Sequence, residues 1–278
     1  MNQTISFNNR IAVRSYASIV GPKEGKGPLR EHFDVILPDD LLGMPSWELA
    51  ESEMIRRAIV MCIEKGGMDV RQVGVVLSGD LLNQIMSSGL AARALGLPFF
   101  GLYGACSTFV EGLVLGGVLV DGGYRENTVN AASSHFCTAE RQFRFPLELG
   151  TQRPPAAQWT TTAAGAMLLD RRAERAVARL THGTIGRVID YQIKDATHMG
   201  AAMAPAVADT ITAHFQDTGR SFADFDLIAT GDLGYIGRNL LKELLIQRGI
   251  QFGYGLGLQV FLGEQAGDVG ADLYFPQL

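Results

Sequence analysis

A cysteine between two apolar segments is the residue of this sequence with the clearest capacity for chemistry. Residues 97–100 form a short apolar run that predicts a buried strand. Residues 109–120 are apolar on nearly all sides except at Glu111, which predicts a buried helix. Cys106 lies between them in the small-residue sequence GACST at 104–108, so we expect it just before or within the first helical turn. Free N–H groups and the helix dipole there favour a thiolate or a carboxylate. The alternative is a small buried residue that happens to be a thiol.

The composition is that of a globular protein, and it argues against a nucleic-acid partner and against a membrane-spanning segment. The chain has 278 residues, of which 47% are hydrophobic and 19% charged, with a formal net charge of −5. This length suits one large domain or two fused halves. Lysine and arginine do not cluster, so we expect no nucleic-acid partner. The polar start lacks a signal-peptide pattern, and the longest apolar run is too short to span a bilayer. Three cysteines without C-x-x-C spacing fit a reducing compartment and predict no metal site.

Strand-like and helix-like segments alternate along the chain, which predicts an α/β fold with mostly parallel strands. Residues 1–45 are expected to be mostly irregular, with an edge strand at 11–13. Ser46 is the expected N-cap of a helix that ends at Gly66–Gly67. Residues 139–146 show no clean period. The other expected elements are strands at 73–77, 99–103, 128–132 and 160–169, and a helix at 85–95.

An internal repeat divides the sequence. VGVVLSGDL at 73–81 resembles FDLIATGDL at 225–233, and the two Gly-Asp-Leu triplets are 152 residues apart. A helical stretch and a short polar loop precede each copy. The shared order of helix, loop, strand and turn indicates a duplicated α/β unit, whose natural ligand site lies between its halves.

Several motifs, in order along the chain, resemble the stage V sporulation protein AD family of spore-forming bacteria. They are GPKE at 21–24, GPL at 27–29, GDLLNQ at 79–84, GACST at 104–108, SSH at 133–135, TAERQFR at 138–144, GRVID at 186–190, MGAAMAPA at 199–206 and TGDL at 230–233. The strand followed by Gly-Ala-Cys at a helix start is also similar to thiolases and ketoacyl synthases. The resemblance covers about residues 21–250.

The resemblance implies a fold and a function. The fold would be thiolase-like, with duplicated α/β halves in a layered αβαβα arrangement, a first half at 1–175 and a second at 176–278. The function would be that of a non-catalytic, dipicolinic acid-binding component of the machinery that moves this compound into the developing spore. The ligand could arrive as its calcium chelate, and no cofactor is implied. The implied partners are the other stage V sporulation A membrane proteins and a second copy of the chain. The implied location is the cytoplasmic side of the forespore, peripheral to the inner spore membrane.

The residues themselves allow a test of the alternative, an acyltransferase that uses Cys106 as its nucleophile. Such chemistry on this fold needs a His, Asn or second Cys from the other half to move protons and stabilise the oxyanion. After Asp209 the only histidine is His214, on an expected helix, and no cysteine follows Cys137. The sequence therefore favours binding over catalysis.

A dipicolinate pocket would need N–H donors or cations with apolar walls, because the ligand is a flat ring with two carboxylates. The helix start at Cys106, Ser107 and Thr108 supplies donors. Arg141 is the first candidate cation and Arg144 the second, with a surface ion pair as the alternative for Arg144.

Four further residues complete the predicted ligand-binding set. Ser134 and His135 end an expected strand, and His135 is equally compatible with a structural role. Asp80 and Asn83 are either ligand contacts or caps of the following helix, and capping is the favoured role of Asp80.

Residues after about 253 resemble nothing in the family. We expect either a truncated or frameshifted copy or a divergent short form. Missing strands would leave an unpaired sheet edge, which residues 260–262 and 273–275 could partly cover.

Overall fold

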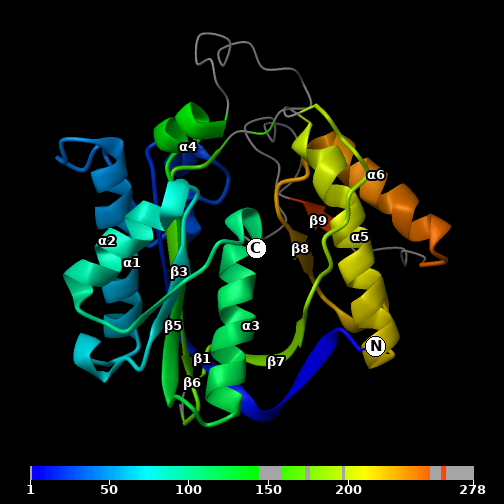
Figure 1. The fold of residues 1–278 in the computed structure, drawn as a ribbon, viewed down its shortest axis with the longest axis horizontal. Coiled ribbons are helices and arrows are strands. Elements are labelled where there is room, and N and C mark those ends of the chain that lie inside the picture. The colour runs from blue at the N-terminus through cyan, green and yellow to red at the C-terminus, as the bar shows by residue number, and fades with distance from the viewer. Residues whose placement is uncertain are drawn as a thin grey trace. The chain divides into compact units, whose positions relative to one another are not determined.

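The computed structural model describes residues 2–143, 158, 160–172, 176–195, 198–250 and 258–260. The chain forms two compact units (Figure 1). The first, here called the cysteine unit, comprises Phe7–Gly150 and Thr160–Thr181. The second, the C-terminal unit, comprises Met1–Ser6, Thr151–Trp159 and His182–Leu278. These two units are defined by contacts within the folded chain. They are not the same as the expected sequence halves at 1–175 and 176–278, so the boundary at residue 175 stays a prediction.

A mixed sheet in the order β2-β1-β6-β5-β3-β4 is the framework of the cysteine unit, and β7 also pairs with β1. The strands are β1 Thr4–Val20, β2 Val35–Ile36, β3 Val76–Gly79, β4 Phe99–Gly101, β5 Asn127–Ser134, β6 Ala163–Asp170 and β7 Ala178–Thr184. β3, β4 and β5 are mutually parallel, whereas β6 runs antiparallel to both β5 and β1. The carboxyl ends of β1, β3, β4 and β5 therefore meet at one edge of the sheet.

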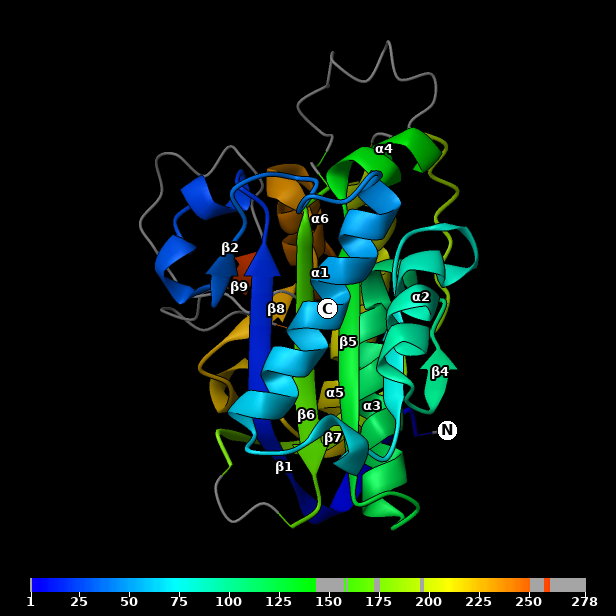
Figure 2. The same cartoon turned by 90° about the vertical axis from the view of Figure 1, so that its left-hand side faces the viewer.

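Helices cover both faces of this sheet. On one face, α1 (Trp47–Lys65) packs on β5 and β6, and α2 (Met86–Leu95) packs beside α1 on β3 and β4. On the other face, α3 (Thr108–Asp121) packs on β5 and β3 (Figures 1 and 2). Ser46 is the N-cap of α1, as predicted, and its hydroxyl accepts a hydrogen bond from the Leu49 N–H. The buried face of α1 forms the main core, and burial raises the pKa of its Cys62 thiol to about 11.

The first 20 residues differ from the sequence-based expectation. Instead of an irregular segment with an edge strand, they form the long strand β1, which lies between β2 and β6. Ser15, Ala17 and Ile19 alternate toward the interior, and the Ser15 hydroxyl donates to the Cys62 carbonyl oxygen at 2.6 Å. The strand is hard to recognise because a serine and an alanine occupy two of its inward positions, between the buried Val13 and Ile19.

Three other elements correct the sequence-based predictions. β4 is an exposed edge strand rather than a buried one, since Phe100 is 55% exposed. α3 is buried on one side only, because Leu115 and Val118 are exposed. The segment without a clean period forms a helix, α4 (Phe136–Phe143), which begins at the end of β5.

The packing of α3 on β5 depends on glycines that face the sheet. A Cβ on Gly116 would lie 2.5 Å from Asn130 Oδ1 and 2.7 Å from Thr128 Oγ1. Asn130 is fully buried, and its Oδ1 has no hydrogen-bond partner. A larger residue at position 116 would therefore push α3 away from the strand.

We predict that Gly116→Ala destabilises the protein by about 1–3 kcal/mol, because the added methyl group overpacks this interface. Gly89→Ala is the matched control, since a Cβ at that position of α2 meets nothing within 4 Å. The control should gain about 0.5–1 kcal/mol from helix propensity. Urea denaturation of both variants provides the measurement. Equal stability of Gly116→Ala and the wild type would contradict this account of the contact.

The C-terminal unit contains α5 (Met199–Thr218), β8 (Ile228–Thr230), α6 (Gly234–Gln247) and β9 (Leu258–Val260), with β8 parallel to β9. Its core lies between α5 and α6, which approach closely where Gly200 faces Gly237.

The two units repeat the same local devices 152 residues apart. α1 starts at Trp47 and α5 at Met199. Capping boxes begin at Asp69 and at Ser221, each at the start of a short 3-10 helix before the strand. The carboxylates of Asp80 and Asp232 both accept from the backbone N–H two residues ahead, at 2.9 Å. These matched details support the duplication inferred from sequence.

Among the described residues, no helix is both long enough and apolar enough to cross a membrane. That part of the chain also contains no group of three or more His, Cys, Asp or Glu side chains placed to hold a metal ion.

Candidate functional site

The predicted site residues gather around the carboxyl ends of β3, β4 and β5 in the cysteine unit. In open α/β sheets, ligands bind outside this edge. The turn after β4 crosses closely over the end of β3: a Cβ on Gly79 would overlap the Leu102 carbonyl oxygen and lie 2.9 Å from Thr108 Cγ2. Glycine at position 79 therefore brings the start of α3 against the end of β3.

Cys106 occupies the predicted place at the start of a helix. It lies in a 3-10 turn, Ala105–Ser107, that leads directly into α3, and the residue is exposed. The protein atoms around the sulfur remove part of its hydration, which raises the pKa of the thiol. Glu111 adds a carboxylate nearby, because its Oε2 would lie 2.5 Å from a Cβ on Gly104. The position is that of a nucleophile, but the surroundings favour a neutral thiol.

Ser107 and Thr108 flank the cysteine in different environments. The Ser107 hydroxyl is exposed and donates to the Gly104 carbonyl oxygen at 2.9 Å. Thr108 is 1% exposed, and its Oγ1 is buried without a hydrogen-bond partner. A buried hydroxyl that lacks a partner is costly, so Thr108 is the residue here with the most to gain from a bound polar group.

Asp80 has the capping role that the sequence favoured. Its two carboxylate oxygens accept from the Leu82 N–H at 2.9 Å and from the Ser88 N–H, in the first turn of α2, at 2.7 Å. Asn83 is exposed, and its backbone N–H donates to Gln142 Oε1 at 3.0 Å. The Asp80 carboxylate is thus committed to the backbone, whereas the Asn83 side chain stands on the rim of the site.

Ser134 and His135 are both occupied by structural hydrogen bonds. The Ser134 hydroxyl donates to the Thr161 carbonyl oxygen at 2.7 Å. His135 is fully buried, its Nδ1 accepts from the Cys137 N–H at 3.2 Å, and its Nε2 lies 2.8 Å from the Asp40 carbonyl oxygen. Because Nδ1 accepts, Nε2 carries the proton and donates it. Both ring nitrogens are therefore taken by backbone groups.

Arg141, on α4, forms an ion pair with Glu48 in the first turn of α1, and its side chain is 49% exposed. Its neighbour Gln142 joins α4 to the loop after β3, since its amide also donates to the Leu81 carbonyl oxygen at 3.1 Å. Arg141 thus lies beside the loop that carries Asn83. The second candidate cation, Arg144, lies outside the described residues.

A buried carboxyl group beneath this edge escaped sequence-based prediction. Glu51 of α1 is 1% exposed; its Oε1 is 2.9 Å from Ser133 Oγ and its Oε2 is 3.2 Å from Thr138 Oγ1. Burial, with a smaller repulsion from Asp80, raises its pKa to about 8. The hydrogen bonds from Ser133 and Thr138 lower this pKa, but by less than burial raises it; the Thr138 hydroxyl also lies 3.0 Å from the His135 carbonyl oxygen.

We predict that Glu51 makes folding depend on pH. Its pKa rises from 4.5 to about 8, so between these values the folded chain binds more protons than the unfolded chain. The free energy of unfolding should therefore fall as pH increases through this window, by on the order of 5 kcal/mol in total. Glu51→Gln keeps a neutral donor at the same place and should remove this dependence.

Urea denaturation from about pH 5 to about pH 9 measures the effect. Glu64→Gln is the control, because Glu64 is an exposed carboxyl on the same helix and the variant should retain the wild-type pH profile. A Glu51→Gln profile that parallels the wild type would show that Glu51 is ionised throughout.

Backbone strain concentrates at the same edge. Five of the described non-glycine residues have a left-handed φ, and three of them are Gln84 at 59°, Ile85 at 47° and Ala105 at 47°. Ile85 lies against β4, where a Cβ on Gly101 would overlap its Cδ1. Such conformations persist where the surrounding structure enforces them, and they cluster at functional sites.

Comparison with known families places the whole chain in one group. A family model described as stage V sporulation protein AD matches residues 1–271. The stage V sporulation protein AD of Bacillus subtilis (strain 168) is 40% identical over 266 residues, covering 95% of this chain and 78% of the relative. The match extends beyond residues 21–250, so the expectation that nothing after 253 resembles the family was too narrow.

Solved structures confirm the predicted fold class. Cerulenin-bound OleA from Xanthomonas campestris, a thiolase-like protein, aligns with a TM-score of 0.64 and 15% identity, covering 94% of this chain and 86% of OleA. An OleA structure with bound lauric acid and lauroyl-CoA aligns with a TM-score of 0.61 and 15% identity, over 88% of this chain and 83% of OleA. The chain therefore has a thiolase-like α/β fold.

Proposed function

We propose a function for this chain from its family, because the chain belongs to the stage V sporulation protein AD family. The chain is a non-catalytic component of the machinery that moves dipicolinic acid into the spore. We place the ligand at the carboxyl edge of the cysteine unit, beside Cys106. Family membership supports a role in sporulation, and the chemistry of this edge supports the ligand.

The observation that carries the proposal is the start of α3. It combines an exposed Cys106, a helix N-terminus and the unpartnered, buried hydroxyl of Thr108. The N-terminal end of a 14-residue helix is favourable for an anion. One carboxylate of dipicolinate would face this end, and the Thr108 hydroxyl would gain the partner that it lacks.

Exposed aromatic residues and a cation stand near this helix start. Tyr103 is 67% exposed in the turn before Cys106, and Phe143 is 57% exposed at the end of α4. The segment from Leu81 to Ile85 lies between them, in contact with Gln142 on one side and with Gly101 on the other. Such rings suit a flat aromatic ligand, and the half-exposed guanidinium of Arg141 suits its second carboxylate.

The alternative function is acyl transfer on Cys106, as in thiolases and ketoacyl synthases. The likeness to OleA favours it only as a fold, at 15% identity. The raised pKa of the Cys106 thiol opposes it. Three histidines are engaged within their own units: His135 by backbone groups, His198 by the Ala201 N–H that its Nδ1 accepts, and His214 by Thr184 Oγ1, 2.8 Å from its Nδ1. Binding without catalysis is the better-supported function.

The proposal extends to partners and place. We propose that two copies of the chain form a homodimer and that this dimer binds the other stage V sporulation A membrane proteins. The complex would lie on the cytoplasmic side of the forespore, peripheral to the inner spore membrane. Dipicolinate would arrive free or as its calcium chelate, and no cofactor would be needed.

Calorimetric titration with dipicolinate, with and without calcium, tests the ligand. Cys106→Trp should weaken binding at least tenfold, because the indole would fill the space beside the helix start. Ile246→Trp is the matched control, since Ile246 is 60% exposed in the other unit, and it should bind like the wild type. Unchanged binding in Cys106→Trp would place the ligand elsewhere, and no binding by the wild type would favour a structural scaffold.

Intact mass spectrometry after incubation with an acyl-coenzyme A tests the alternative. We expect no acyl adduct, because a neutral thiol without a base is a poor nucleophile. Cys106→Ala provides the reference mass for any labelling elsewhere. An adduct on the wild type that the variant lacks would establish acyl transfer to Cys106.

A further inference from the structure

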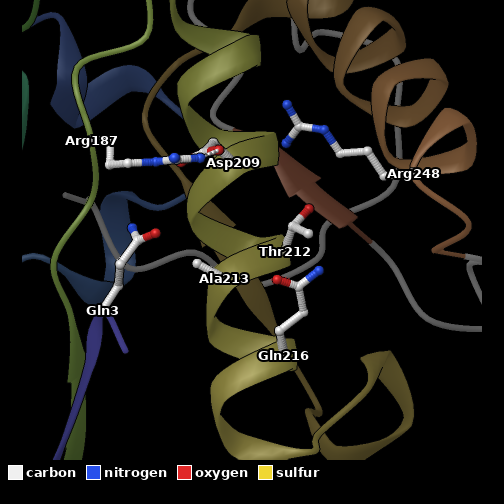
Figure 3. Close-up of a pocket in the computed structure, with 7 residues that line it drawn as sticks. All are labelled: Gln3, Arg187, Asp209, Thr212, Ala213, Gln216 and Arg248. Carbon is white, nitrogen blue, oxygen red and sulfur yellow. Dashed lines mark hydrogen bonds and ion pairs between the residues drawn. The ribbon is translucent and has the colours of Figure 1, made fainter. Parts of the chain in front are cut away.

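A polar cavity of about 410 Å³ lies within the C-terminal unit, and none of the predicted site residues lines it. Its wall is one face of α5, with Asp209, Thr212 and Gln216, and Arg248 just after α6 stands opposite (Figure 3). Ala213, Gln3 and Arg187 complete the lining. The volume falls within the range of about 300–1,000 Å³ that is typical of small-molecule sites.

This cavity is lined by more positive than negative side chains, namely Arg187 and Arg248 against Asp209. Asp209 is 8% exposed, and Arg187 holds it through two hydrogen bonds, from Nη2 to Oδ1 at 2.5 Å and from Nε to Oδ2 at 3.1 Å. The Arg187 guanidinium lowers the pKa of this carboxyl, and Arg248 adds a smaller electrostatic contribution. A single carboxylate, already bound at both oxygens by one arginine, therefore faces two guanidinium groups.

One nitrogen of the Arg248 guanidinium lacks a hydrogen-bond partner. This atom, Nη1, is buried, and burial of a charged donor is costly unless it is paired. The residue's backbone N–H donates to the Leu245 carbonyl oxygen, so the backbone is fixed while Nη1 remains unsatisfied. A bound oxyanion would supply the missing acceptor.

A second cavity of about 380 Å³ continues from the first and is lined by apolar side chains together with Arg220 and Ser221. The two share Thr212, Gln216 and Arg248, and the second adds Phe215, Phe222 and Ile250. Phe215 and Phe222 meet edge to face, with ring centroids 5.1 Å apart. The shared residues put a charged compartment and an aromatic compartment in series.

We propose that these two cavities form a binding site for a small amphipathic anion, whose carboxylate or phosphate group pairs with Arg248 and whose apolar or aromatic part lies against Phe215 and Phe222. The site is separate from the one beside Cys106. It does not depend on the proposed function, because every residue that carries it belongs to the C-terminal unit.

Titration with inorganic phosphate and with phenyl phosphate tests both compartments. Phenyl phosphate should bind at least tenfold more tightly than phosphate, since only it reaches the aromatic compartment. Benzoate provides the carboxylate arm, and benzyl alcohol, which lacks the charge, should not bind. Equal affinity for phosphate and phenyl phosphate would overturn the two-compartment site.

Two variants and one control localise the binding. Arg248→Gln removes the cation, and Gln216→Trp blocks both cavities from an exposed position. Each should weaken phenyl phosphate binding at least tenfold. Arg93→Gln makes the same charge change on exposed Arg93 of α2 and should bind like the wild type. Thermal melts show whether each variant is folded. If one of the two variants is unfolded, phenyl phosphate binding by the folded variant tests the proposal.

Dipicolinate provides the final comparison. Arg248→Gln should retain dipicolinate binding while Cys106→Trp retains phenyl phosphate binding, and this double dissociation would establish two sites. If Arg248→Gln loses binding of both phenyl phosphate and dipicolinate, the result would support an anion site in the cavity and would show that dipicolinate also binds there. Wild-type affinity for phenyl phosphate in both Arg248→Gln and Gln216→Trp would overturn the proposal.

Discussion

The close approach of α3 to the sheet sets the position of the candidate site. Gly116 permits contact with Asn130 and Thr128 along the helix, and Gly79 permits the turn after β4 to cross the end of β3. Both contacts exclude even a methyl group. Because the helix is held at both places, the 3-10 turn that leads into it, with Cys106, is packed against the end of β3. The functional edge is therefore a consequence of backbone packing as much as of its polar side chains.

Duplication supplied one scaffold, and the two units use it differently. α1 and α5 begin at equivalent positions, yet α1 carries buried Glu51 on the face toward the sheet, whereas α5 carries Asp209, Thr212 and Gln216 along a cavity. The N-caps, capping boxes and Asx turns match because they fix the backbone. The side chains that bear chemistry do not match.

Local signals predicted the elements that have strong local causes. The cap at Ser46, the helices α1 and α2, and the placement of Cys106 at a helix start all follow from the sequence. β1 was missed because a serine and an alanine interrupt its row of inward apolar residues, and α4 because its short sequence mixes charges and aromatics. Sequence could have identified Glu51, since it lies beside Ala50, Met54 and Ile55 on the buried face of α1.

The individual site residues were harder to predict than the elements. Sequence could not distinguish a ligand-binding His135 from a structural one, because the distinction depends on Asp40, far away in the chain. The cavity in the C-terminal unit gave no local signal at all. Gln3, Arg187 and Arg248 are brought together only by the fold, and no spacing rule connects them.

The left-handed backbone at Ala105 has a consequence for the evolution of this protein. Glycine would adopt that φ of 47° without the steric penalty that alanine bears, about 1 kcal/mol. A glycine would also lose about 0.5–1 kcal/mol more backbone entropy on folding, which offsets most of that strain. Selection for heat resistance alone would therefore have little reason to replace this alanine, whose methyl group also restricts the turn that holds Cys106.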